Sequence, residues 1–184
     1  FVFAGADLAG VRNHLQGQDA VAVGEIGLDA SDGCPPLDLQ ISFLRAQLDL
    51  AANLGLPVLL HCRKAYDTLY TCLLPYRGRL QGILHSYSGG KGQMPRFLEL
   101  GFYIAFSGSV TRPSARRYAE TAAAVPPDRF LLETDAPSIA TATRRASEVE
   151  PCHIVEIANK IADLRCISLA GVCEQTWENA CRLF

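Results

Sequence analysis

Short apolar runs recur along the chain, and most of them end at a side chain that can hold a metal ion or a proton. The runs and the residues that follow them are 21–24 before Glu25, 58–60 before His61, 83–84 before His85, 102–106 before a Ser-Gly-Ser turn, and 130–132 before Glu133-Thr134-Asp135. They follow one another at roughly the 30 residues that a strand, a helix and two short loops occupy. We therefore predict successive βα units in an α/β fold, each of which places its polar residue at the carboxyl end of a parallel strand.

Helical spacing of apolar residues fills the segments between these runs. The predicted helices are 37–54, 65–74, 94–100, 114–124, 154–164 and 169–183, preceded by the end of a strand at 1–4 and a helix around 8–15. We expect Trp177 and Phe184 to pack in the last of these helices. A chain of 184 residues with 49% apolar residues suits one domain, which we place at residues 1–184.

Composition excludes several classes of protein. The net charge of −2 does not fit a basic tail that binds nucleic acid, so a polyanion would have to be held by a local cluster or by metal ions. The apolar runs are too short to span a bilayer, which needs about 20 residues. Seven cysteines without a Cys-x-x-Cys pair argue against a disulfide framework or a zinc ribbon. They favour buried, reduced thiols, with Cys62 in the core, and an intracellular location, either cytoplasmic or nuclear.

Four side chains converge at one rim if the strands are parallel: Glu25, His61, His85 and Asp135. Two imidazoles and two carboxylates suit Zn²⁺, Mn²⁺ or a similar ion, although a salt bridge to a basic residue is the alternative for Glu25. A pair of such ions would activate water and hold phosphate oxygens, and a carboxylate such as Asp135 could take the proton. Glu133, two residues before Asp135, could orient a neighbour.

Four segments together resemble the motifs of the TatD-type metal-dependent deoxyribonucleases. They are Val-Gly-Glu-Ile-Gly-Leu-Asp at 23–29, Pro-Val-Leu-Leu-His-Cys-Arg at 57–63, Ile-Leu-His-Ser-Tyr-Ser-Gly at 83–89 and Leu-Leu-Glu-Thr-Asp-Ala-Pro at 131–137. The resemblance implies a TIM-barrel-like fold, two divalent metal ions (Mg²⁺, Mn²⁺ or Zn²⁺) and hydrolysis of phosphodiester bonds in a DNA substrate, often from a 3′ end. It also implies that Glu25 bridges the metals, that His61 and His85 bind one ion, and that Asp135 binds the other and acts as base. We add Arg63 as a phosphate contact.

One motif of that family is missing, because the sequence contains no His-x-His pair. We therefore expect a barrel that is incomplete at its N-terminus, with about the last five βα units and unpaired sheet edges. Three hypotheses follow: a TatD-like nuclease, a metal-dependent hydrolase of other bonds such as those of esters or lactones, and a weakened or inactive remnant that binds a metal or a partner.

Overall fold

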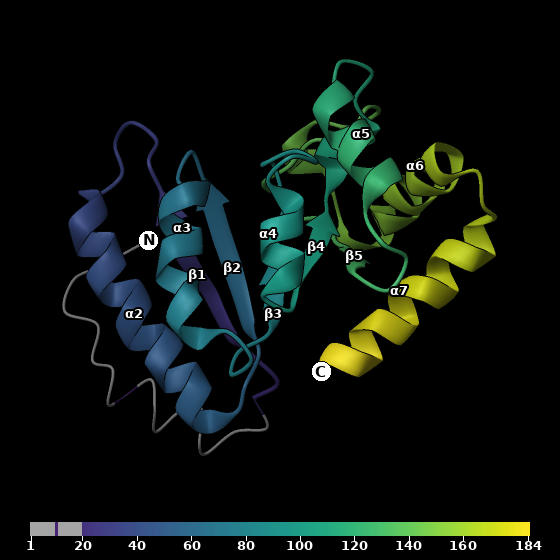
Figure 1. Cartoon of the computed structure of the whole chain (residues 1–184). Coiled ribbons are helices and arrows are strands. Elements are labelled where there is room, and N and C mark those ends of the chain that lie inside the picture. The colour runs from purple at the N-terminus through teal and green to yellow at the C-terminus, as the bar shows by residue number, and fades with distance from the viewer. Residues whose placement is uncertain (1–9, 11–19) are drawn as a thin grey trace.

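The described part of the chain, residue 10 and residues 20–184 of a computed structural model, is built on a parallel sheet (Figure 1). Its strands lie side by side in chain order: β1 (Val23–Asp29), β2 (Val58–Arg63), β3 (Gly82–Leu84), β4 (Phe102–Phe106) and β5 (Phe130–Leu132). Every neighbouring pair is parallel, which confirms the predicted α/β class. The strand end expected at 1–4 and the helix expected around 8–15 lie outside the described residues.

Helices connect the strands and follow the last one. The α-helices are α2 (Leu37–Leu54), α3 (Tyr66–Leu73), α4 (Met94–Glu99), α5 (Arg116–Ala124), α6 (Ile154–Arg165) and α7 (Leu169–Leu183). Short 3₁₀ turns lie at η1 (Leu74–Tyr76), η2 (Gly108–Thr111), η3 (Ala146–Glu148) and η4 (Pro151–His153). Because the strand order never reverses, right-handed crossovers place the connecting helices on one face of the sheet, as Figure 1 shows for α2, α3 and α4. None of the described helices combines the length and apolar character needed to cross a membrane.

The bounds and the buried face of helix α2 follow directly from its local sequence. Leu44, Leu48 and Ala51 recur at helical spacing and are all buried against the sheet. The helix ends at Gly55, whose positive φ of 66° lets its N–H bond to the carbonyl of Ala51. Its bounds match the prediction.

The two faces of the sheet bury different residues. Alternation along β2 sends Val58 and Leu60 into the large core shared with the helices, and sends Leu59 to the opposite face. On that opposite face, Leu59 packs with side chains of neighbouring strands and of α7, namely Ile83, Tyr103, Ala105, Leu131, Ala180 and Leu183. His61 and Arg63 continue this second face toward the carboxyl edge, whereas Cys62 lies in the helix-side core, as predicted.

Strand β1 corrects our prediction of a buried strand that ends just before Glu25. The strand begins at Val23 and runs to Asp29, so that Glu25 lies inside it, and Val21 is 62% exposed. Pairing with β2 is irregular between Val23 and Ile26, where Glu25 is located. The prediction was wrong because β1 is the outer strand of the described sheet, and a strand covered on one side alternates instead of forming a continuous buried run.

The expected packing of Trp177 and Phe184 is wrong, because these side chains are 71% and 52% exposed. Helix α7 buries Val172, Asn179 and Leu183 instead. The face of α7 that carries Trp177 is turned toward α6 and β5 but does not pack closely against them. Trp177 there lines an open cavity of about 310 Å³ beside β5.

The cysteine prediction holds only in part. All seven thiols are free, and Cys62 and Cys72 are buried. The remaining five are exposed, contrary to the expectation of buried thiols: Cys34, Cys152, Cys166, Cys173 and Cys181. Most of them lie in the C-terminal helical part, where the sheet no longer provides a second layer to cover them.

Gly27 sets how closely β1 approaches β2 next to the site. Its φ is +154°, and a Cβ built there would lie 1.9 Å from the backbone oxygen of His61. We therefore expect Gly27→Ala to lower the free energy of unfolding by about 2–4 kcal/mol in urea denaturation. Gly92→Ala, where nothing lies within 4 Å of the added Cβ, is the matched control and should change it by less than about 0.5 kcal/mol. Equal effects of the two substitutions would contradict the close-contact argument.

Candidate metal-binding and catalytic site

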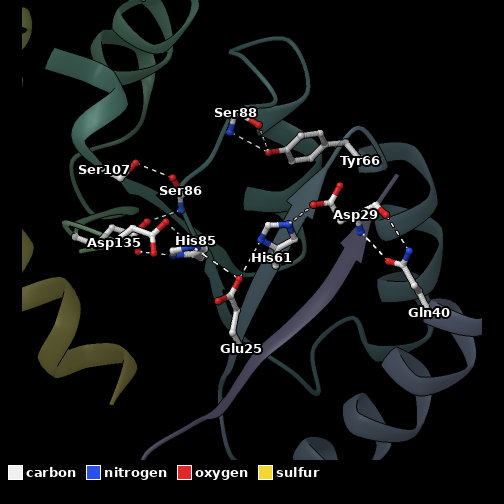
Figure 2. Close-up of polar contacts among 11 residues, drawn as sticks. Glu25, Asp29, Gln40, His61, Tyr66, His85, Ser86, Ser88, Ser107 and Asp135 are labelled. Atoms are coloured by element: carbon white, nitrogen blue, oxygen red, sulfur yellow. Dashed lines mark hydrogen bonds and ion pairs between the residues drawn. The ribbon is translucent and has the colours of Figure 1, made fainter. Parts of the chain in front are cut away.

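The four side chains predicted to converge lie together at the carboxyl edge of the sheet (Figure 2). Glu25 Oε1 is 3.0 Å from His61 Nδ1 and 3.9 Å from His85 Nε2. Asp135 Oδ2 is 3.6 Å from the same His85 nitrogen, on the other side of the ring from Glu133. The strands β1, β2 and β3 and the segment after β5 thus bring these groups to one place from four parts of the sequence.

A cavity of about 470 Å³ opens over this cluster. Arg63, the predicted phosphate contact, lines it and is exposed, and no carboxylate in the described part of the chain pairs with its guanidinium. The remaining lining is rich in hydroxyl groups: Ser86, Ser88, Ser109, Tyr118 and Ser138. An unpaired cation among hydroxyl donors suits a ligand that carries phosphate oxygens.

Glu133 fixes the orientation of His85. One carboxylate oxygen is 3.0 Å from His85 Nδ1, and the other accepts a hydrogen bond from the backbone N–H of Ser86. Nδ1 therefore holds the proton in the neutral ring, and Nε2 points toward Glu25 and Asp135 as a lone-pair donor. Asp135 has a φ of 53°, so the chain is no longer extended there, but both carboxylates of the Glu-Thr-Asp segment still reach His85.

Asp29 plays the corresponding part for His61. Its Oδ2 is 3.3 Å from His61 Nε2, which leaves Nδ1 to face Glu25. The backbone of Asp29 is in turn fixed by the buried side chain of Gln40, which accepts from its N–H and donates to its carbonyl, both at 2.8 Å (Figure 2). Each histidine of the site thus has one nitrogen held by a carboxylate and the other directed into the cluster.

Electrostatics of the cluster follow from this arrangement. The hydrogen bond to His61 lowers the pKa of Glu25, and the same bond raises the pKa of His61. Burial by itself would lower the pKa of His85, but Glu133, Glu25 and Asp135 raise it to about 9. Burial raises the pKa of Asp135, against the opposing charge of His85 and with the help of Glu133 and Glu25, which brings this carboxyl closer to the range of a general base.

The metal-free protein should therefore lose stability at high pH through His85. Because the pKa of His85 rises from 6.5 to about 9 on folding, the stabilisation by its imidazolium is complete below about pH 6.5 and is lost as pH rises through about 9. The free energy of unfolding should be measured in urea with EDTA from pH 6 to 10, for the wild type and for His85→Gln. We expect the stability advantage of the wild type over His85→Gln to shrink by roughly 3 kcal/mol across this range. His153→Gln is the control, and parallel pH curves for wild type and His85→Gln would contradict the prediction.

The donor set fits a divalent transition metal. Glu25, His61 and His85 each offer one ligand atom, and these atoms lie within 4.8 Å of one another. Ligand atoms bound to one ion at roughly 2.0–2.2 Å each can be no more than about 4.4 Å apart, so small side-chain movements would complete the geometry. Asp135 is outside this group of three but beside His85, where it could serve a second ion that shares Glu25.

Sequence reasoning gave no role to several residues of the site. Asp29 ended the first of the segments that resembled the family, and for Gln40 the available signal was a glutamine on the apolar face of helix α2. Ser86 bonds to Ser107 at 2.6 Å, which links the loops after β3 and β4, and Ser88 bonds to Tyr66 at the start of α3 at 3.1 Å (Figure 2). Tyr118 carries no recognisable motif, and only the fold places it in the cavity.

One family model covers almost the whole chain. The sequence model of the TatD related DNase family matches residues 4–184. The chain belongs to this family. A TatD homologue from Escherichia coli K12, YjjV, has a crystal structure with a TM-score of 0.90 to this TatD-family chain at 32% identity, covering 96% of this chain and 69% of the other. The open parallel sheet therefore has the TIM-barrel-like α/β architecture of the TatD structures.

Similar proteins are named either as metal-dependent hydrolases or as exonucleases. A Bacillus subtilis (strain 168) protein named uncharacterized metal-dependent hydrolase YabD is 32% identical over 97% of this chain and 70% of its own length. An Erwinia tasmaniensis protein named 3′-5′ ssDNA/RNA exonuclease TatD is 33% identical over 99% of this chain and 73% of its own length. These names support a metal-dependent hydrolase of the TatD family; the ligand and base roles of individual side chains stay predictions.

Proposed function

We propose that this TatD-family protein is a divalent-metal-dependent nuclease that hydrolyses phosphodiester bonds in DNA, and that it works from a 3′ end. The observation that carries the proposal is the cluster of Glu25, His61, His85 and Asp135 beneath a cavity that also holds the unpaired Arg63. Relatives named 3′-5′ ssDNA/RNA exonuclease support the choice of substrate.

The residues of the cluster would have different roles in hydrolysis. Glu25, His61 and His85 would hold one ion, and Asp135, with Glu25 as the shared ligand, a second. Bound there, such an ion supplies a Lewis acid and lowers the pKa of a coordinated water. Asp135 would take the proton of the attacking water, since its raised pKa makes it a better base than an ordinary aspartate.

Neighbouring groups would prepare the site and hold the substrate. Glu133 and Asp29 keep the two imidazoles in the orientation that leaves a nitrogen lone pair for the metal. Arg63 would neutralise a phosphate oxygen, and the serine hydroxyls of the cavity would donate hydrogen bonds to others. The two imidazoles, Ser86 and Ser88 are already held by hydrogen bonds within the protein, which lowers the ordering cost of binding.

The test is hydrolysis by the purified protein in EDTA and with added Mg²⁺, Mn²⁺ or Zn²⁺. Substrates labelled at the 5′ or the 3′ end would include single-stranded DNA, single-stranded RNA and a carboxylic ester. The proposal predicts metal-dependent shortening of 5′-labelled DNA in single-nucleotide steps. If the protein cleaves only the ester, the nuclease proposal is wrong and the esterase hypothesis takes its place. No turnover of any substrate, with metal still bound, would replace it with the binding-remnant hypothesis.

A further inference from the structure

Tyr118, in the first turn of α5, is one of the residues that line the cavity. Its ring is partly buried against the helix-side core, and the guanidinium carbon of Arg117 lies 5.7 Å from the ring centroid. Core side chains and Arg117 thus pack around the Tyr118 ring. With the ring partly covered in this way, the phenol hydroxyl is the group of Tyr118 that can form a hydrogen bond with a ligand.

The hydroxyl of Tyr118 has no hydrogen-bond partner among the described residues. The two nearby tyrosines differ, since Tyr66 bonds to Ser88 and Tyr87 to the carbonyl of Gly90. A half-buried phenol that lines a polar cavity without a protein partner has a donor available for a ligand.

Arg117, whose guanidinium lies over the ring of Tyr118, adds a positive charge next to this cavity residue. It is exposed, and no carboxylate of the described residues pairs with it, whereas the adjacent Arg116 is 2.8 Å from Glu120. Its aliphatic stem lies against the loop that follows His85, because a Cβ built at Gly90 would be 3.1 Å from Cγ and Cδ of Arg117. The stem is therefore supported while the charge stays available.

We propose that Tyr118 and Arg117 together bind the phosphate next to the scissile one in a nucleic-acid strand. The proposal rests on the proposed function, because it takes the scissile phosphate to lie at the cluster of Glu25, His61, His85 and Asp135. Tyr118 comes from α5, which follows β4, and Arg63 from the end of β2, so we assign the two to different positions along a bound strand. A phenol donor beside a guanidinium recognises a phosphate oxygen, which every nucleotide presents irrespective of its base.

The consequence is a preference for substrates with at least two phosphodiester bonds. Hydrolysis of the thymidine dinucleotide, which has one such bond, would be compared with that of the trinucleotide, which has two. Tyr118→Phe and Arg117→Gln should each lower kcat/KM for the trinucleotide about 10-fold, chiefly through KM, and leave the dinucleotide unchanged. Tyr70→Phe is the matched control, because its ring also lies under an arginine, Arg96 at 4.1 Å, but outside the cavity. Equal losses on both substrates, or on neither, would overturn the proposal.

A binding measurement separates this proposal from the proposed function. Fluorescence anisotropy of a fluorescein-labelled thymidine trinucleotide in EDTA needs no turnover. Absence of hydrolysis by the wild type would count against the nuclease function alone. A Kd raised about 10-fold by Tyr118→Phe, and unchanged by Tyr70→Phe, would still support the phosphate site. Equal Kd values for wild type and Tyr118→Phe would refute it.

Discussion

Replacing Glu25 by alanine is expected to release the metal and to abolish hydrolysis. Among the described residues, Glu25 is the carboxylate within 4.0 Å of both imidazoles, at 3.0 Å from His61 and 3.9 Å from His85. Loss of a group that merely orients a ligand weakens metal affinity 10- to 100-fold, so loss of a direct and shared ligand should cost more than about 100-fold. His85→Ala should behave in the same way, because its Nε2 lies between Glu25 and Asp135.

Two measurements check this expectation. Metal content after dialysis, by elemental analysis, should fall from about one tightly held ion in the wild type to none in Glu25→Ala. Hydrolysis of labelled single-stranded DNA should fall in parallel at fixed metal concentration. Glu99→Ala, which removes an exposed carboxylate on α4 outside the cavity, should change neither. Unchanged metal-dependent activity in Glu25→Ala would refute the ligand assignment.

The sequence allowed the site to be anticipated because of a simple property of parallel sheets. Polar residues that come late in or just after parallel strands gather near the same edge, so Glu25, His61, His85 and Asp135 could be grouped without coordinates, although Glu25 and His61 lie inside β1 and β2. The bounds of β4, β5 and α2 were equally accessible, since strong apolar patterns and glycine stops marked them.

Other features depend on tertiary context that no local pattern encodes. The place of Glu25 inside β1 follows from an irregularity in its pairing with β2, and the roles of Asp29 and Glu133 follow from which imidazole nitrogen each one meets. Tyr118 reads as one more residue of an amphipathic helix until the fold brings α5 over the cavity. The apolar periodicity of α7 similarly gave no sign that Trp177 would face away from the core.

Asp135→Asn is expected to separate catalysis from metal binding. The substitution keeps the shape of the side chain but removes its ability to take a proton. Asp135 lies beside His85 and outside the closest group of three donor atoms, so the first ion should remain bound. Loss of a general base lowers rates by about 10²–10⁴-fold. We therefore expect kcat to fall by this factor while the content of the tightly held ion stays at the wild-type value.

The pH dependence of kcat supplies the decisive comparison for Asp135. In the wild type, activity should rise with pH through the raised pKa of this carboxyl, because only the ionised form accepts a proton. In Asp135→Asn, kcat should be low and should no longer rise with pH. In Asp163→Asn, at an exposed position on α6, both kcat and its rise with pH should equal those of the wild type. A variant that kept the wild-type profile and rate would show that the base lies elsewhere. One that lost the tightly held ion would place Asp135 among its ligands.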